Sequence, residues 1–186
     1  ANKFKNHLAK ELENFLSRDT LIIGICNGFQ IVTNLGILPG GLRHNKNGRY
    51  LDRWVDLKVT GVSPWLTGIS NLSILIAHEE GGITIPAKKY AKMKKNRVIC
   101  CMYVKGDICK LQNLEKHPNS YDFGIAGVLA YNGRVLGLMP HPERGMFSQQ
   151  NPTWHINKKT TKASPIGLRP REGAGLQIFK NGIKYF

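Results

Sequence analysis

The sequence lacks several features that would assign it to a specialised class of protein. None of its apolar runs reaches the roughly 18 uninterrupted residues that a membrane-spanning helix needs. Its four cysteines, three of them clustered, do not form the disulfide framework of a small secreted protein. The Gly-x-x-x-x-Gly-Lys-Ser/Thr loop that binds nucleotide phosphates is absent. With no apolar signal peptide at the start either, we expect no membrane association and a cytoplasmic location.

Acidic residues are scarce as well. Twelve aspartates and glutamates stand against 27 lysines and arginines, which gives a formal net charge of +15. Such a field can attract nucleic acid, an acidic partner or a phosphorylated substrate, or simply favour solubility. The densest basic run, residues 88–97, is typical of the solvated face of a surface helix. Because no helix-turn-helix, zinc-finger spacing or stacking-aromatic motif accompanies it, we expect no nucleic-acid binding.

The apolar residues that are present suffice for one globular domain over residues 1–186. They make up 41% of the chain and recur with clear periodicity. Strands are predicted at residues 21–25, 54–60, 72–77, 98–104, 124–131 and 134–139, and helices at 2–17, 29–35 and 176–183. Asn132-Gly133 predicts a hairpin between the last two strands, and residues 148–175 read as a long basic loop. The pattern indicates an α/β fold that mixes parallel and antiparallel strands.

Residues 21–30 organise the chain, because a buried-strand pattern ends there at Cys26. Gly24-x-Cys26-x-Gly28 is typical of a nucleophile elbow, a sharp strand-to-helix turn that needs small residues on both sides. The N-terminus of the following helix favours the thiolate, and the backbone N–H of Asn27 points to where an oxyanion would form. A cysteine beside glycine is also common in protein cores. A second motif has to supply a base.

A candidate base, His141, lies just past another apolar strand. Pro142 disfavours helix at His141 and holds the segment extended, so that side chains two residues apart share one side. Glu143 can then hold the imidazole in the tautomer that accepts the cysteine proton. The alternative is a strand end with a solvated histidine and glutamate. Because both motifs follow an apolar strand, where α/β sheets build their sites, a Cys26–His141–Glu143 triad is the better interpretation.

These two motifs resemble those of the class I (triad) glutamine amidotransferases. Residues 24–30 (Gly-Ile-Cys-Asn-Gly-Phe-Gln) and 139–144 (Met-Pro-His-Pro-Glu-Arg) are most similar to the versions in the glutaminase component of phosphoribosylformylglycinamidine synthase, a purine-pathway enzyme. Further matches lie at residues 35–40, 76–81, 117–120 and 125–127. The resemblance covers most of the chain from about residue 20 onward.

The resemblance implies a flavodoxin-like mixed sheet and a glutaminase that releases ammonia from L-glutamine through a Cys26 thioester. The ammonia would pass to a synthetase subunit or domain, where ATP and Mg²⁺ support amination of formylglycinamide ribonucleotide; no cofactor or metal is expected in this chain. The implied glutamine-binding residues are Gly28, Gln30, His78, Asn119 and Ser120. For Gln30 the alternative is a polar residue that satisfies the elbow helix, and for His78 a strand cap. Glu79 stands where the family usually has glycine.

The family's domain begins with strand–helix units ahead of the nucleophile strand, and a glycine-rich loop among them supplies a second oxyanion N–H. From this resemblance we expect an N-terminally incomplete domain with an exposed apolar sheet edge and weak activity by itself, since one lost donor costs about a hundredfold in rate. Three alternatives stay open: another Cys–His–Glu hydrolase such as a γ-glutamyl peptidase, a non-catalytic interaction subunit, or a nucleic-acid-binding module.

Overall fold

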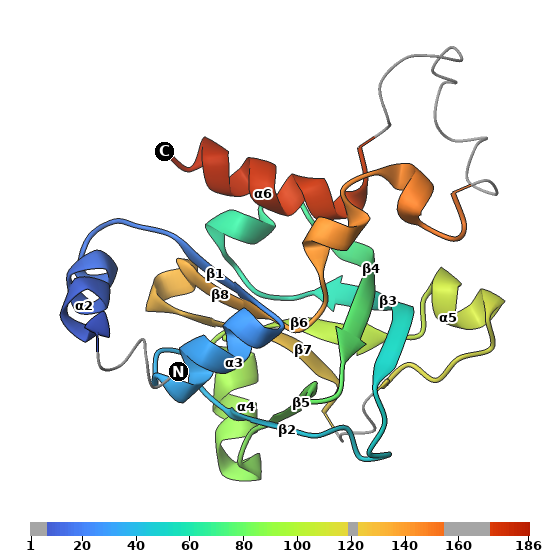
Figure 1. Cartoon of the computed structure of the whole chain (residues 1–186), viewed down its shortest axis with the longest axis horizontal. Coiled ribbons are helices and arrows are strands. Elements are labelled where there is room, and N and C mark those ends of the chain that lie inside the picture. The colour runs from blue at the N-terminus through green and yellow to red at the C-terminus, as the bar shows by residue number, and fades with distance from the viewer. Residues whose placement is uncertain (1–6, 119–122, 155–171) are drawn as a thin grey trace.

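A six-stranded sheet with the order β1-β8-β7-β6-β3-β4 forms the centre of the molecule (Figure 1). The computed structural model describes residues 7–118, 123–154 and 172–186. The strands are β1 (Ile22–Ile25), β3 (Leu51–Val59), β4 (Asn71–His78), β6 (Ile99–Val104), β7 (Ile125–Ala130) and β8 (Val135–Leu138). β1 runs parallel to β8, and the other neighbouring pairs of this sheet are antiparallel. The predicted mixed sheet is therefore confirmed.

Helices cover both faces of this sheet. The helices are α2 (Ala9–Ser17), α3 (Asn27–Asn34), α4 (Ala87–Lys95), α5 (Asp107–Leu111) and α6 (Ala174–Lys184). α6 packs on one face together with the short helix η1 (Pro64–Leu66), and α3 packs on the other against β1 and β8 (Figure 1). Within the described ranges, no helix has the length and apolar character to cross a bilayer.

Each face has its own hydrophobic core. The core under α6 joins Leu57, Ile74 and Ile178, and the core under α3 contains Phe29 and Met139. All five side chains are almost completely buried, and burial of this kind contributes about 1.5–3 kcal/mol per large aliphatic or aromatic side chain. The helix that follows Cys26 is thus fixed to the sheet through Phe29.

Gly137 of β8 lets α3 approach the sheet closely. A Cβ atom at this position would lie 2.4 Å from the Phe29 ring and 2.5 Å from a methyl group of Leu38. Only glycine leaves room for the aromatic ring against the strand at this position. The start of α3 is thereby held next to the carboxyl end of β8.

Several predicted elements have different bounds or were missed. A small second sheet pairs β2 (Gly41–Arg43) with β5 (Gly82–Thr84), and neither strand was predicted because three residues carry no measurable period. Helix α5 was missed for the same reason. The predicted loop at 148–175 is described only at its ends, where Ser148–Gln150 form the short helix η4 and Phe147 bridges to Glu172; residues 155–171 lie outside the described residues.

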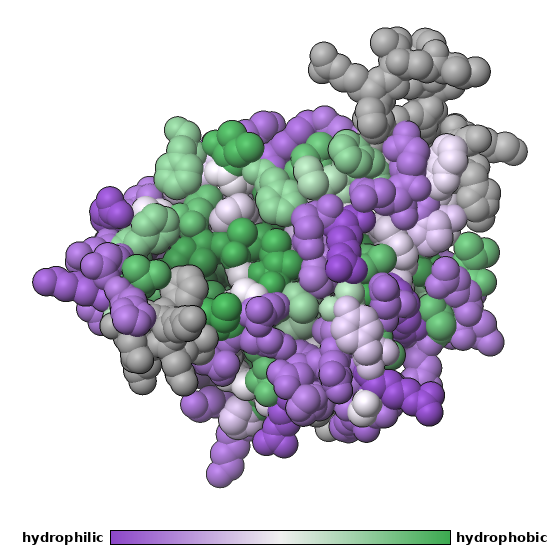
Figure 2. Space-filling model, in the orientation of Figure 1, coloured by the Kyte–Doolittle hydropathy of each residue, from purple (hydrophilic) through white to green (hydrophobic). Residues whose placement is uncertain are grey.

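The apolar character of the surface is uneven. β1 is an edge strand, and Ile22, Ile23 and Ile25 are only half-buried. Figure 2 shows hydrophobic residues gathered over the region of β1 and β8, whereas hydrophilic residues cover the lower part of this face, where α4 lies. α4 has no fully buried residue, as predicted for a solvated basic helix.

Candidate active site

Cys26 sits at a strained turn between β1 and α3. Its backbone adopts φ 49° and ψ −105°, a conformation that costs a non-glycine residue of order 1–3 kcal/mol and that recurs at functional sites. Its N–H donates to the carbonyl of Leu138 on the neighbouring strand (2.9 Å). A Cβ atom at Gly24 would lie 2.9 Å from the carbonyl oxygen of Gly28, so that only glycine fits there. The predicted nucleophile-elbow geometry is present.

The expectation of a second close approach, at Gly28, was wrong. A Cβ atom built on Gly28 meets no heavy atom within 4 Å. The sequence pattern alone could not separate a glycine that is required by packing from one that borders open space. The space next to Gly28 adjoins the turn that carries Cys26.

His141 and Glu143 lie beside the nucleophile. His141 follows β8 as Cys26 follows β1, and the two strands are parallel neighbours. Nδ1 of His141 lies 2.5 Å from a carboxylate oxygen of Glu143. The contact was predicted, and His141 is extended, as expected for a residue before Pro142. The expected placement of Glu143 was wrong: Pro142 begins the short helix η3 (Pro142–Gly145), so that Glu143 lies in a helical turn and not on an extended segment.

Electrostatics favour a proton on His141. Its interaction with the Cys26 thiol is the largest cause of a raised pKa, burial opposes it, and the hydrogen bond that Nδ1–H donates to the carboxylate of Glu143 adds to it. Nε2 of His141 is buried and has no well-aligned hydrogen-bond partner among the described residues. The thiol itself donates to the carbonyl oxygen of Ala77, with 3.7 Å between sulfur and oxygen. No other described group competes with the thiol for the lone pair on Nε2.

Strand β4 closes the site from the other edge of the sheet. The N–H of His141 donates to the carbonyl of Leu75 on β4 (2.8 Å), although β4 and β8 are not neighbours in the strand order. The carboxyl ends of β1, β8 and β4 therefore meet at one place. Each of them delivers a polar side chain there, namely Cys26, His141 and His78.

His78 is an unusually isolated imidazole. It is 3% exposed, and both ring nitrogens lack a hydrogen-bond partner among the described residues. Burial, and next the charge of His141, lower its pKa to about 4, so that the ring is neutral. A Cβ atom at Gly81 would lie 2.0 Å from the ring, which is therefore enclosed by backbone. Buried polar groups without a partner are rare in native structures and mark places where a ligand or water completes the bonding.

Asn27 occupies the first position of α3. The backbone N–H groups of a first helical turn have no acceptor within the helix, and they carry the positive end of the helix dipole. This is the placement expected for an oxyanion donor. Asn119 and Ser120, which were predicted to contact glutamine, lie outside the described residues.

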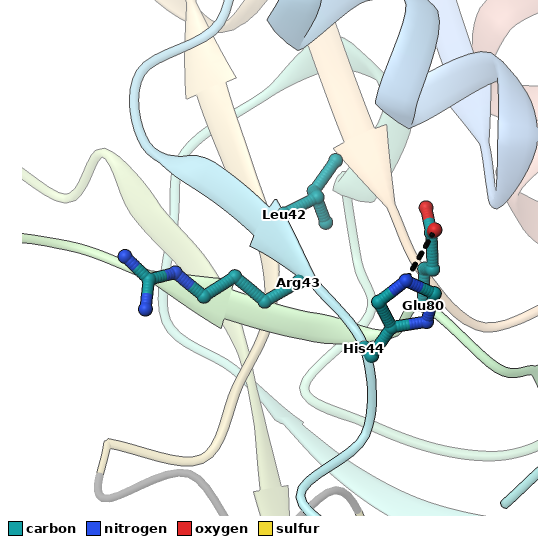
Figure 3. A pocket seen from close by; sticks show the side chains of 4 residues that line it. All are labelled: Leu42, Arg43, His44 and Glu80. Carbon is teal, nitrogen blue, oxygen red and sulfur yellow. Dashed lines mark ion pairs between the residues drawn. The ribbon is translucent and has the colours of Figure 1, made fainter. Parts of the chain in front are cut away.

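Gln30 lies one helical turn after Cys26 and reaches Glu80. Its side-chain Nε2 donates to the backbone carbonyl of Glu80 (3.1 Å) and lies 3.4 Å from a carboxylate oxygen of the same residue. The second carboxylate oxygen pairs with Nε2 of His44 at 3.1 Å (Figure 3). The sequence could not predict this ion pair, because no spacing rule connects residues 44 and 80, which the β2–β5 pairing brings together.

A pocket of about 420 Å³ opens at this point, lined by Leu42, Arg43, His44 and Glu80 (Figure 3). Glu80 is the residue that sequence reasoning missed. Among the described residues, no group of three or more histidine, cysteine, aspartate or glutamate side chains gathers as a metal site.

Comparisons with known proteins agree with this geometry. A family profile described as the CobB/CobQ-like glutamine amidotransferase domain matches residues 1–186. The chain is 37% identical over 199 residues to phosphoribosylformylglycinamidine synthase subunit PurQ of Methanococcus maripaludis strain C5, covering 100% of this chain and 74% of that protein. It is 39% identical over 143 residues to the PurQ subunit of Aquifex aeolicus, covering 74% of this chain and 61% of that one. The structure of PurLQS from Thermotoga maritima matches with a TM-score of 0.64 and 29% identity, over 98% of this chain and 68% of that one.

Proposed function

This chain belongs to the CobB/CobQ-like glutamine amidotransferase family, and we propose that it is the glutaminase of a phosphoribosylformylglycinamidine synthase, acting through Cys26, His141 and Glu143. Its relatives are PurQ subunits of that enzyme, and the match covers the whole chain. One observation carries the catalytic assignment: the cysteine and the histidine follow two neighbouring parallel strands, and a carboxylate holds the far nitrogen of the histidine.

The first half of the reaction forms a thioester. Nε2 of His141 accepts the proton of the Cys26 thiol, and the sulfur attacks the side-chain carboxamide carbon of glutamine. The oxyanion of the tetrahedral intermediate accepts a hydrogen bond from the N–H of Asn27. When the intermediate collapses, the carbon–nitrogen bond breaks, His141 returns the proton to the leaving nitrogen, and ammonia departs.

The second half returns the enzyme to its starting state. Nε2 of His141 takes a proton from water, which attacks the thioester carbonyl, and glutamate leaves as the sulfur regains a proton. Throughout, the carboxylate of Glu143 accepts the hydrogen bond from Nδ1–H of His141. This bond keeps Nε2 as the basic nitrogen and stabilises the imidazolium form.

The ammonia is used by a synthetase partner. The relation to the Thermotoga maritima PurLQS structure supports such an assembly, and we assign the ATP and Mg²⁺ of the amination to that partner. Gly28, Gln30, His78, Asn119 and Ser120 remain our proposed glutamine contacts. Open space beside Gly28 and the unpartnered nitrogens of His78 support this assignment for those two residues.

Labelling with an electrophilic glutamine analogue tests the proposal. The chain is treated, with its synthetase partner present, with a diazoketone analogue of glutamine, and the modified residue is located by mass spectrometry. We expect label on Cys26 alone, because Cys100, Cys101 and Cys109 are completely buried. Cys26→Ser should remove the label, and His141→Ala should slow it by about 100-fold or more, the range of general-base effects.

Slow, equal labelling of all four cysteines would contradict the proposal. Efficient hydrolysis of a γ-glutamyl peptide that needs no synthetase would instead favour a peptidase.

A further inference from the structure

Glu80 forms one wall of the pocket in Figure 3, and its position relative to Cys26 is fixed from two sides. From α3, the side-chain amide of Gln30 donates a hydrogen bond to the backbone carbonyl of Glu80. Gln30 lies about one helical turn beyond Cys26, a rise of about 6 Å along the helix axis. Glu80 lies just past the end of β4 and follows Ala77 by three residues, no more than about 10 Å of chain, and the carbonyl of Ala77 accepts from the Cys26 thiol. The carboxylate and the nucleophile therefore belong to one neighbourhood.

The Glu80 carboxylate is held in place, and among the described residues no lysine or arginine pairs with it. Its partners are the neutral amide of Gln30 and the imidazole of His44, and its side chain is 47% exposed to solvent. Arg43 lines the same pocket, but its guanidinium extends away from Glu80 (Figure 3). In a chain of net charge +15, a fixed carboxylate at a pocket mouth is a local exception that attracts a cationic ligand group.

Free glutamine carries one cationic group, the α-ammonium. From the carboxamide carbon to the α-nitrogen the extended molecule spans roughly 5 Å. That reach fits a carboxamide at Cys26 with the amino-acid end near the first turn of α3, where Gln30 and Glu80 meet. The pocket volume of about 420 Å³ lies at the small end of ligand-sized cavities, as suits an amino acid.

We propose that Glu80, oriented by Gln30 and His44, binds the α-ammonium group of L-glutamine and so selects the free amino acid over amides that lack this group. The inference rests on the proposed glutaminase function. It also gives Gln30 a definite part: its side-chain amide positions the carboxylate that receives the substrate. Glu80 is a specificity residue and takes no part in the chemical steps at Cys26.

The test combines a substrate that lacks the α-ammonium group with a variant that lacks the Glu80 carboxylate. Ammonia release is measured for glutamine and for glutaramate, which keeps the carboxamide and the carboxylate but lacks the α-ammonium group. The wild-type chain, assayed with its synthetase partner, should prefer glutamine by at least about tenfold in kcat/KM, as expected for a charge-assisted hydrogen bond. In Glu80→Gln, kcat/KM for glutamine should fall by about 10- to 100-fold, mainly through KM, while kcat/KM for glutaramate changes less than about threefold.

Two controls separate this inference from the proposed function. Glu79→Gln removes the neighbouring exposed carboxylate and should leave both substrates unaffected. Glu80→Asp keeps the charge and should retain part of the preference. Equal losses for both substrates in Glu80→Gln, or no loss for either, would overturn the assignment of Glu80. If the wild type hydrolyses neither substrate, the glutaminase proposal itself fails.

Labelling of the wild-type chain tests the proposal without any substitution at Glu80. Wild-type Cys26 should react with the diazoketone analogue of glutamine at least about tenfold faster than with the analogue that lacks the α-amino group. This comparison uses the unaltered chain, so it tests the proposal even if Glu80→Gln is unstable. Equal rates for the two analogues would contradict it.

Discussion

At the scale of single residues, the two imidazoles of the site have pKa values that are displaced in opposite directions. Burial and the charge of His141 lower the pKa of His78 to about 4, whereas Cys26 and then Glu143 raise the pKa of His141. Opposite displacement of neighbouring groups is how a site assigns different roles to the same chemical group. In the mechanism that we propose, His141 takes and returns protons, while His78 stays neutral and can only offer or accept hydrogen bonds.

The buried state of His78 predicts a loss of stability in acid. The unfolded chain binds a proton at the ordinary pKa of 6.5, whereas the native chain binds it only near pH 4. Between these values the unfolded state holds more protons, so the free energy of unfolding falls as pH falls, by on the order of 3 kcal/mol in all. Urea unfolding at pH 8 and pH 4.5 should show a smaller difference for His78→Gln than for the wild type. The same difference in both proteins would contradict the prediction.

Glu143 should act through the protonation of His141. Glu143→Gln removes one of the causes that raise the pKa of His141, so the acid limb of the kcat/KM profile should move to lower pH. We expect kcat to fall by about 10- to 100-fold, because the imidazolium loses its carboxylate. The measurement is the pH profile of glutamine hydrolysis between about pH 5 and pH 9. An unmoved acid limb would mean that the Nδ1 contact is dispensable.

At the scale of elements, the turn between β1 and α3 provides a matched pair of glycines. A methyl group at Gly24 would meet backbone atoms at 2.9–3.0 Å, whereas one at Gly28 meets nothing within 4 Å. Gly24→Ala should therefore cost roughly 2 kcal/mol or more and displace Cys26. Gly28→Ala should leave the free energy of unfolding within about 1 kcal/mol of the wild type, since alanine favours helix.

Denaturant unfolding of both alanine variants measures this difference directly. Cys26 labelling in Gly24→Ala then reports whether the elbow has moved. Similar unfolding free energies for the two variants would show that the turn can relax around an added methyl group.

The sequence predicts the long elements well and the short ones poorly. The strand before Cys26, the hairpin at Asn132-Gly133 and the helix that ends the chain carry clear periodicity or turn chemistry, and all are present. β2, β5 and α5 span three to five residues, too few for a period to emerge. The contact between His44 and Glu80 could therefore not be predicted, because the β2–β5 pairing brings these two residues together.

Buried polar residues were likewise beyond sequence reasoning. Asp56 lies in the middle of β3 and is 5% exposed, a position that alternation alone assigns to the solvent face. Its carboxylate accepts hydrogen bonds from the Ser73 hydroxyl (2.8 Å) and from the backbone N–H of Cys109 (3.0 Å). These partners come from distant parts of the chain, and only the folded sheet brings them together.

At the scale of the whole molecule, Arg134 ties the start of the described chain to the sheet. Its guanidinium donates to the carbonyls of Leu16, Arg18 and Thr20, at the end of α2 and in the link to β1. Nearby, the Tyr185 hydroxyl donates to the carboxylate of Asp19 (2.5 Å), so that the residues after α6 reach the same link. The two ends of the described chain are joined beside the nucleophile strand.

Arg134→Met should loosen this junction. Several carbonyls lose a charged donor, for an expected cost of about 1–3 kcal/mol in the free energy of unfolding. Glutamine hydrolysis by the folded fraction should keep its KM, because Arg134 lies at the opposite end of β8 from His141. Urea unfolding measures the cost. Arg49→Met, an exposed arginine, serves as the control, and an equal effect of both changes would contradict the role given to Arg134.

The parallel pairing of β1 with β8 has a consequence for how the molecule comes to be active. It joins Ile22 to Val135, and contacts of such long sequence separation are slow to form during folding. Cys26 and His141 meet only when this pairing is complete. A chain that is still folding therefore contains Cys26 and His141 but not the assembled pair. We expect it to hydrolyse no glutamine until the sheet is complete.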